Sequence, residues 1–254
     1  MKTIGLIAAM SLECEAFLQY IKQWERITLG SLRGFRFQHM DLDCLLVTTG
    51  MGPKRAADGT QALLAGTSPD LLVSFGIAGA VNDDLDIGDV VVAGQVYSLV
   101  EGQLGQPKIL STLSTAAWNT AAHNMRGEGA LLVAGTAITT RGSQVIPQSL
   151  VRMTHPILEM ETAGIAQVAA EAGVPLLSIR SISDGPKAPI PIDLEAVIDD
   201  EYNFRIAKLL FEVIRKPRII LQAKKMITNS RKAADHAART LLAILSQPSP
   251  IISM

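Results

Sequence analysis

The stretch "DLLVSFGIAGAV" at residues 70–81 indicates the fold most directly. Its first half, residues 70–75, is a nearly continuous apolar run, which is typical of a strand buried on both faces of a sheet. The second half contains Gly76 and Gly79, and glycine lets the backbone approach a ligand closely. In open α/β sheets, ligands bind beyond the carboxyl ends of the strands. The stretch therefore predicts a central strand that ends at a ligand site.

Similar apolar runs predict strands at residues 3–8, 43–48, 88–93, 131–138 and 176–182. Residues 27–40 alternate apolar and polar residues around two glycines, which indicates an antiparallel excursion of the chain. Ala- and Leu-rich segments predict helices near residues 11–22, 53–65, 113–124, 144–153, 160–172, 199–214 and 218–246. Strands that alternate with helices are typical of a sheet covered on both faces. We therefore expect an α/β fold, a three-layer αβα sandwich with a mixed central sheet, formed by residues 1–254 as a single domain.

The composition excludes several classes of protein. With 48% hydrophobic and 19% charged residues and a net charge of -1, the chain is neither disordered nor broadly attracted to nucleic acid. Cys14, Cys44 and the four histidines show no metal-ligand spacing, so we expect no metal ion, no cofactor and reduced thiols in the cytoplasm. The apolar "IGLIAAM" at residues 4–10 predicts a strand and not a signal peptide. No apolar stretch approaches the roughly 20 residues needed to span a bilayer.

Three further strand ends carry polar or glycine-rich segments. They are "AAMSLECE" at residues 8–15, "TTGMGPK" at residues 48–54 and "RSISDGP" at residues 180–186. The "GMGPK" part matches neither a Walker loop nor a full dinucleotide fingerprint, so a tight turn is its simplest interpretation. The three segments together predict a ligand site built from several strand ends.

The stretch "LEMETAG" at residues 158–164 places two carboxylates, Glu159 and Glu161, where an apolar helical run begins. Acidic residues suit the first turn of a helix because they face the positive end of its dipole and its unpaired N–H groups. Carboxylates beside a ligand site could equally contact the ligand. The residues of this stretch leave both interpretations open.

Six segments together resemble the nucleoside phosphorylase and nucleosidase superfamily, and within it most of all the methylthioadenosine/S-adenosylhomocysteine nucleosidases. They follow the family's order and about its spacing: "IGLIAAMSLECE", "TTGMGPKRAA", "DLLVSFGIAGAV", "IGDVVVA", "LEMETAGIAQVA" and "VPLLSIRSISD". The resemblance covers residues 3–92 and 130–214. It implies a nucleoside phosphorylase-like fold, a homodimer, and cleavage of the N-glycosidic bond of a purine ribonucleoside. The expected substrate is an adenine nucleoside with a modified 5′ group.

The resemblance also implies roles for three carboxylates. Asp184 matches the acid that protonates the leaving purine, and Glu13 matches the general base that activates water. Glu161 matches the residue that binds the ribose hydroxyls, and Met160 the residue that packs against the sugar. Structural alternatives remain, with Glu13 as an ordinary first-turn glutamate and Asp184 as a cap or turn residue before Gly185.

Other positions are implied to contact the acid or the substrate. Arg180 and Ser183 match residues that position the acid, although Arg180 could equally neutralise a nearby carboxylate. Ile138 and Thr139 lie where the family contacts the base, largely through the backbone. The turn after the central strand adds Ile77, Ala78 and Gly79 to the expected substrate site.

The sequence departs from the nucleosidase pattern where water and phosphate are handled. Ile77 stands where the nucleosidases commonly have a serine, which removes a hydroxyl near the expected nucleophile. The phosphorylases hold phosphate with arginines, and Ser74 precedes Phe75 where such an arginine would be expected. Hydrolysis is therefore favoured over phosphorolysis. Phosphate as a co-substrate stays open, because Lys54, Arg55 or a partner subunit could supply positive charge.

The C-terminal region is locally basic in a nearly neutral chain. Asp235 is its single acid between residues 215 and 245, against the basic residues Arg215, Lys216, Arg218, Lys224, Lys225, Arg231, Lys232 and Arg239. Apolar residues recur at helical spacing, at Ile219, Ile220, Ala223, Met226, Ile227, Ala233, Ala237, Leu241 and Leu245. The amphipathic helix predicted near residues 218–246 either packs on the core with a solvated basic face or contacts an anionic membrane surface peripherally.

The same region resembles the C-terminal part of hopanoid-associated phosphorylases, which implies an alternative substrate, an adenosyl-lipid. Futalosine hydrolase belongs to the same class of enzyme, and no residue selects it. A catalytically inactive nucleoside-binding protein is an alternative of another kind. The presence of Glu13, Glu161 and Asp184 together argues against it, because a binding protein needs no acid and base.

Overall fold

The computed structural model describes residues 2–141, 147–189, 219–247 and 251–252. The helix predicted at residues 199–214 lies outside the described residues. So do Arg215, Lys216 and Arg218 of the basic region and the side chains of Ile219, Ile220 and Ala223.

The strands of the described ranges form one sheet. They are β1 (Lys2–Ala8), β2 (Glu25–Leu29), β3 (Leu32–His39), β4 (Leu42–Thr48), β5 (Leu71–Ala80), β6 (Val90–Val100), β7 (Gln103–Leu104), β8 (Lys108–Ile109), β9 (Leu132–Thr139), β10 (Pro156–Glu159) and β11 (Leu176–Asp184). The order across the sheet is β10-β9-β6-β11-β5-β1-β4-β3-β2, and the short strands β7 and β8 pair with β6. The pairs among β4, β1, β5 and β11 are parallel, whereas β3 pairs antiparallel with β2 and β4. The prediction of a mixed sheet is therefore confirmed.

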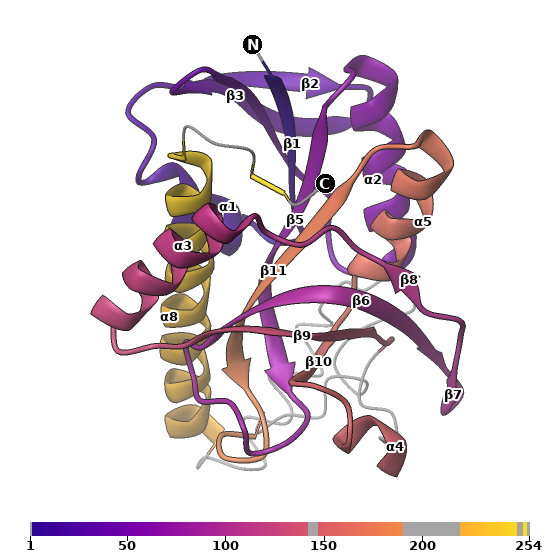
Figure 1. The fold of residues 1–254 in the computed structure, drawn as a ribbon, viewed down its shortest axis with the longest axis vertical. Helices are drawn as coiled ribbons and strands as arrows, with labels where there is room; N and C mark the ends of the chain where they lie inside the picture. The colour runs from indigo at the N-terminus through magenta and orange to yellow at the C-terminus, as the bar shows by residue number, and fades with distance from the viewer. Residues whose placement is uncertain (1, 142–146, 190–218, 248–250, 253–254) are drawn as a thin grey trace.

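Helices cover both faces of this sheet. They are α1 (Ser11–Leu18), α2 (Pro53–Gly66), α3 (Thr115–Gly127), α4 (Gln148–Val151), α5 (Thr162–Ala172) and α8 (Ile219–Leu245). On one face α8 packs against α1 and α3 and along β11 and β5, and on the other α2 packs against α5 (Figure 1). The predicted three-layer αβα arrangement is confirmed. None of these described helices is long and apolar enough to cross a membrane.

Two clusters of buried apolar side chains fill the space between the layers. Phe17 of α1 and Leu241 of α8 belong to the cluster on one face of the sheet. Leu63 of α2 and Ile165 of α5 belong to the cluster on the other. β5 contributes to both, because successive side chains of a strand point to opposite faces. This is why its sequence is apolar at consecutive positions.

β5 is longer than the sequence predicts, and β10 is a strand that the sequence does not predict. β5 continues through the glycine-containing segment to Ala80, because its end pairs with both β11 and β10. β10 has only four residues, begins with Pro156 and ends with Glu159, so its pattern is too short to recognise. β10 also pairs with β9, and the strands β10, β9, β6, β11 and β5 thereby close into a ring.

Several predicted helices differ from the observed ones at their ends, and α3 runs over Thr115–Gly127 where the sequence predicts residues 113–124. The helix predicted at residues 11–22 ends at Leu18, because the N–H groups of Tyr20 and Ile21 then donate to carbonyls three residues back, in a tighter turn. The helix predicted from residue 160 begins at Thr162, because the chain before it is still leaving β10. Of the helix predicted at residues 144–153, the described part is helical over Gln148–Val151.

α8 spans the residues of the predicted C-terminal helix and buries part of its apolar face. The predicted apolar residues that are buried are Ala233, Ala237, Leu241 and Leu245. Ile227, nearer the start of the helix, is 48% exposed. The exposed basic side chains near it on the helix are those of Lys224, Lys225, Arg231 and Lys232, and Thr228 is exposed as well. The second half of α8 is therefore part of the core, whereas the turn around Ile227 presents an apolar side chain among basic ones.

Candidate active site

Glu13 lies in the first turn of α1, directly after β1, and its side chain is buried. Its Oε2 accepts the backbone N–H groups of Ala9 and Met10, both at 2.9 Å. Its Oε1 accepts the N–H of Ile77 on β5 at 3.0 Å. Burial raises the pKa of Glu13, and the charge of Arg180 and these N–H groups oppose the rise in part. The carboxyl group therefore links the ends of β1 and β5 and retains a proton more readily than an exposed glutamate.

Two glycines of β5 make room for two carboxyl groups. A Cβ atom at Gly76 would overlap the carboxylate of Glu13. A Cβ atom at Gly79 would lie 2.6 Å from Oδ1 of Asp184. The carboxyl groups of Glu13 and Asp184 thus fill the space that side chains at Gly76 and Gly79 would take. The sequence predicts that the glycines let the backbone approach a ligand closely, and in the structure the backbone approaches these two catalytic candidates.

Asp184 is the last residue of β11 and follows a register shift between Ile182 and Asp184. The hydroxyl of Ser183 donates to its Oδ2 at 2.6 Å. Burial raises the pKa of Asp184, and the hydrogen bond from Ser183 lowers it in part. Ser183 therefore contacts Asp184 directly, and its role in positioning an acid stays a prediction.

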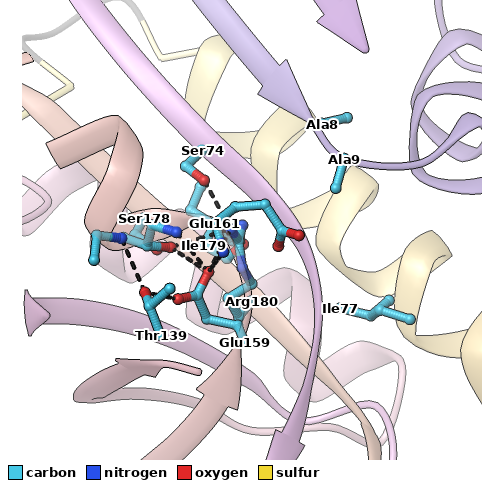
Figure 2. A network of polar contacts seen from close by, with 12 residues as sticks. Ala8, Ala9, Ser74, Ile77, Thr139, Glu159, Glu161, Ser178, Ile179 and Arg180 are labelled. Carbon is cyan, nitrogen blue, oxygen red and sulfur yellow. Dashed lines mark hydrogen bonds and ion pairs between the residues drawn. The ribbon is translucent and has the colours of Figure 1, made fainter. Parts of the chain in front are cut away.

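A buried ion pair joins Glu159 at the end of β10 to Arg180 in the middle of β11 (Figure 2). Nη2 of Arg180 lies 3.2 Å from Oε2 of Glu159, and it also donates to Ser74 Oγ at 2.8 Å and to Thr162 Oγ1 at 3.1 Å. Burial opposes ionisation of Glu159, but Arg180 and the hydrogen bonds from Thr139 and Thr162 outweigh it, and its pKa is lowered. Glu159 is therefore the ionised carboxylate of the site.

Glu159 also holds the start of α5. Its Oε2 accepts the N–H of Glu161 at 3.0 Å and both the N–H and the hydroxyl of Thr162 at 2.7 Å. The hydroxyl of Thr139 donates to its Oε1, and that same oxygen of Thr139 accepts the N–H of Ala163 at 2.9 Å. Of the two glutamates in "LEMETAG", Glu159 is therefore the one that accepts the unpaired N–H groups at the start of the helix, as the helix-dipole interpretation predicts.

Glu161 is the N-cap residue of α5, and its carboxyl group turns toward α2. Its Oε1 accepts the N–H of Gly52, just before α2, at 3.0 Å. Burial and the negative charge of Glu159 raise the pKa of Glu161 to about 8, although Arg180 and Gly52 favour the ionised form. Glu161 therefore keeps its proton to a higher pH than an exposed glutamate.

The structure gives less evidence for substrate contacts by the remaining predicted residues. The side chain of Ile138 is fully buried in a small apolar cluster, so only its backbone could meet a base. The hydroxyl of Thr139 is used by Glu159 and α5, and the side chain of Ala78 belongs to the core. Met160 and Ile77 are half-buried. Substrate contacts by these residues stay predictions.

Arg180 had two interpretations from the sequence, and the structure shows the contacts of one. Among the described residues, it bonds Glu159 and not Asp184, so it neutralises a carboxylate. The sequence does not identify Ser74 and Thr162 as members of this network. The available signal is Arg180 itself, because a charge in the middle of a buried strand requires a buried partner.

A cavity of about 170 Å³ opens beside Asp184 on the side of α8. The loop after β11 and the turn before β6 form two of its walls, and Lys225 and Asn229 of α8 form a third. Asp184 therefore borders a space that is also bordered by the basic helix.

The four buried carboxyl groups of the site differ in how readily they hold a proton. Glu159 is held ionised, whereas burial raises the pKa values of Glu13, Glu161 and Asp184. Glu13 and Asp184 come from opposite sides of β5, at the carboxyl ends of β1 and β11. Such a site can supply both a proton donor and a proton acceptor to one ligand.

Comparisons with known proteins agree with this fold. A family model described as "Phosphorylase superfamily" matches residues 3–215. A 5′-methylthioadenosine/S-adenosylhomocysteine nucleosidase of Tolumonas auensis is 29% identical over 204 residues, which are 73% of this chain and 88% of the relative.

Two solved structures show the same fold. A nucleosidase of that name from Colwellia psychrerythraea, in complex with adenine, has a TM-score of 0.72 at 20% identity over 96% of this chain and 94% of its own. The futalosine hydrolase of Helicobacter pylori has a TM-score of 0.68 at 19% identity over 95% of this chain and 96% of its own. Proteins named for different substrates thus share this architecture.

Proposed function

Because the chain belongs to the phosphorylase superfamily, we propose that it hydrolyses the N-glycosidic bond of an adenine ribonucleoside with a modified 5′ group and releases free adenine. The nucleosidase of Tolumonas auensis supports this class of substrate. The observation that carries the proposal is the pair formed by Glu13 and Asp184. Both carboxyl groups are seated against glycines of one strand, and burial raises the pKa of both.

Asp184 donates its proton to the purine as the C–N bond breaks, and the electron pair of that bond leaves with the base. Burial keeps the carboxyl group protonated to a higher pH than an ordinary aspartate. The hydroxyl of Ser183 stabilises the carboxylate that remains. Glu13 accepts a proton from water while the water oxygen bonds to the anomeric carbon of the sugar. The products are adenine and a sugar with a free anomeric hydroxyl.

Glu161 accepts hydrogen bonds from the ribose hydroxyls. Its Oε1 already accepts the N–H of Gly52, which fixes the carboxyl group at the start of α5. Hydroxyl donors favour the ionised form, so substrate binding displaces the proton that a pKa of about 8 holds there. Met160, next to Glu161 and half-buried, packs against the sugar.

The surroundings of Glu13 support water over phosphate as the nucleophile. Its carboxyl group is held by three backbone N–H groups, and Arg180 is already paired with Glu159. As the general base Glu13 must be ionised when the nucleophile binds, and its carboxylate would then repel a phosphate dianion. Water carries no such cost.

Incubation with 5′-methylthioadenosine or S-adenosylhomocysteine, with and without inorganic phosphate, tests the reaction by mass spectrometry. We expect adenine and a sugar with a free anomeric hydroxyl, at a rate independent of phosphate. A sugar 1-phosphate that forms only with phosphate would identify a phosphorylase instead. Release of no adenine from these or from a wider panel of adenine nucleosides would identify a binding protein.

We propose a homodimer as well, which the resemblance to the family supports. Light scattering at micromolar concentration tests it, and a mass equal to one chain would contradict it.

A second candidate function is cleavage of an adenosyl-lipid at a membrane surface. The exposed Ile227 favours it, because basic residues surround it on α8. Basic residues attract anionic headgroups, and an apolar side chain among them can enter the interface. Lys225 belongs to this surface and also lines the cavity beside Asp184. A helix bound to a membrane would therefore bring that cavity close to the lipid.

A further inference from the structure

We propose that His236 of α8, assisted by Lys232, is a positioning residue for Asp184. It acts through the turn at residues 86–89, which joins α8 to the end of β11. The inference rests on the proposed role of Asp184 as the acid.

α8 holds the turn through two hydrogen bonds to backbone carbonyls. Nδ1 of His236 lies 2.7 Å from the carbonyl oxygen of Gly88, and Nζ of Lys232 donates to that of Ile87 at 3.0 Å. Because a carbonyl oxygen can only accept, Nδ1 of His236 carries a proton. His236 is only 4% exposed, so water does not readily replace this bond.

The turn is built for this contact. Gly88 has a φ of +98°, which favours glycine. A Cβ atom there would lie 2.8 Å from Cε of Lys232 and 2.9 Å from Nδ1 of His236. The buried carboxylate of Asp89 accepts the N–H of Asp86 at 2.8 Å and so closes the turn on itself. The turn is therefore held by its own hydrogen bond, by the N–H of Leu131, which donates to Oδ1 of Asp89, and by its contacts with α8.

The turn at residues 86–89 also fixes the end of β11. β11 pairs with β6 only as far as Ser181. The backbone of Ile182 is hydrogen-bonded to the turn at residues 86–89. The N–H of Gly88 donates to the carbonyl of Ile182, and the N–H of Ile182 donates to the carbonyl of Asp89, both at 2.9 Å. Asp184 follows two residues later, beyond the register shift. One edge of the strand that carries the acid is therefore set by a turn that α8 holds.

The opposite edge of β11 lies against β5, where Asp184 fits the space left by Gly79. A small displacement of the turn would move the carboxyl group out of that space and toward the cavity beside it. Asp86, Lys187 and Lys225 line that cavity, and it admits solvent. Loss of the hydrogen bond from His236 should therefore both misplace the acid and hydrate it.

Steady-state kinetics with 5′-methylthioadenosine tests this position for His236. The variant His236→Phe keeps a ring but loses the hydrogen bond, whereas His236→Asn keeps a donor close to the place of Nδ1. His39→Phe is the matched control, because His39 contacts Ser246 at the other end of α8. We expect His236→Phe to lower kcat on the order of 10-fold, with KM within about 2-fold of the wild type. His236→Asn should recover most of kcat.

The pH profile distinguishes positioning from general loss of stability. A more hydrated Asp184 loses its proton at lower pH, so the basic limb of the kcat profile of His236→Phe should move to lower pH. Equal kcat values and profiles for His236→Phe and His39→Phe would overturn the proposal, and so would an asparagine variant as impaired as the phenylalanine one. If His236→Phe does not fold, Lys232→Met decides, and an unchanged kcat there overturns the proposal.

Asp184→Asn in the same series separates this inference from the proposed function. Normal turnover by Asp184→Asn removes the acid and the inference together. An inactive Asp184→Asn beside a normal His236→Phe removes only the positioning role.

Discussion

Oδ1 of Asp184 lies 2.6 Å from the place where a Cβ atom of Gly79 would stand. The acid candidate therefore occupies space that any other residue at position 79 would fill. We expect Gly79→Ala to displace the carboxyl group and lower kcat at least 10-fold, which is about 1.4 kcal/mol of transition-state stabilisation. Gly94→Ala is the control, because its Cβ atom would meet only Thr112 at an ordinary 3.9 Å. Equal turnover by the two variants would contradict this account of the site.

Asp184→Asn should lower kcat on the order of 100-fold or more, since an amide cannot donate a proton as an acid does. The side chain keeps its shape and can still accept the hydrogen bond from Ser183, so thermal unfolding should change little. Asp58→Asn removes an exposed carboxylate on α2 and should match the wild type in turnover. Turnover near that of Asp58→Asn would remove the acid assignment.

Glu161→Gln should stabilise the unliganded protein at alkaline pH. The folded-state pKa of about 8 lies above the ordinary value of 4.5, so the contribution of Glu161 is most favourable below pH 4.5 and is lost as the pH rises to 8. Glutamine does not titrate, and its oxygen can still accept the N–H of Gly52. We expect urea unfolding to show a gain over the wild type at pH 8 of a few kcal/mol, on the order of 1.4 per pKa unit, and little gain at pH 4.5. A gain independent of pH would exclude the protonated Glu161.

Glu159→Gln should destabilise the fold by roughly 3–5 kcal/mol in urea unfolding, because it leaves the charge of Arg180 buried without its partner. The double variant Glu159→Gln with Arg180→Met removes both charges and should recover part of that loss. Lys54→Met breaks an exposed ion pair with Asp58 and should cost less than about 0.5 kcal/mol. A double variant no more stable than Glu159→Gln would show that the hydrogen bonds of Glu159 outweigh its ion pair.

α8 should bind anionic vesicles at low salt if the exposed surface around Ile227 meets a membrane. Each basic residue at the surface contributes about 1 kcal/mol, so Lys224→Glu with Lys225→Glu should weaken co-sedimentation with anionic vesicles. Neutral vesicles and high salt serve as controls. Protein that stays in the supernatant with both kinds of vesicle would leave α8 with a structural role and favour a soluble nucleoside.

The central strands were predictable because each is an apolar run long enough to recognise, as in residues 71–75 of β5. β10 was not, because its role is defined by partners at positions 79–80 and 136–139, which no local pattern reveals. The candidate residues Glu13, Glu161 and Asp184 came from the family resemblance. Composition and periodicity alone indicated only a ligand site at the strand ends.

The network around Glu159 illustrates the limit of local reasoning in another way. A helix-dipole argument correctly predicts a carboxylate at the start of α5, but it does not distinguish Glu159 from Glu161. That distinction depends on Arg180, which lies on another strand and is 21 residues away in sequence. Arg180, Thr139 and Thr162 lower the pKa of Glu159, whereas burial and the charge of Glu159 raise that of Glu161.

The closed ring of strands has a consequence for how the protein folds. β10 joins β5 through Leu158 opposite Gly79, so this pairing of the ring connects residues far apart in the sequence. Long-range pairings of this kind form slowly, because the chain entropy lost in closing the loop precedes the contacts that reward it. Glu159 and Glu161 follow Leu158 directly, whereas Gly76 and Gly79 belong to the other partner strand. Pairing of β10 with β5 therefore brings the segment that carries Glu161 to the strand that carries Gly76 and Gly79, so the candidate site is complete only when these distant segments have paired.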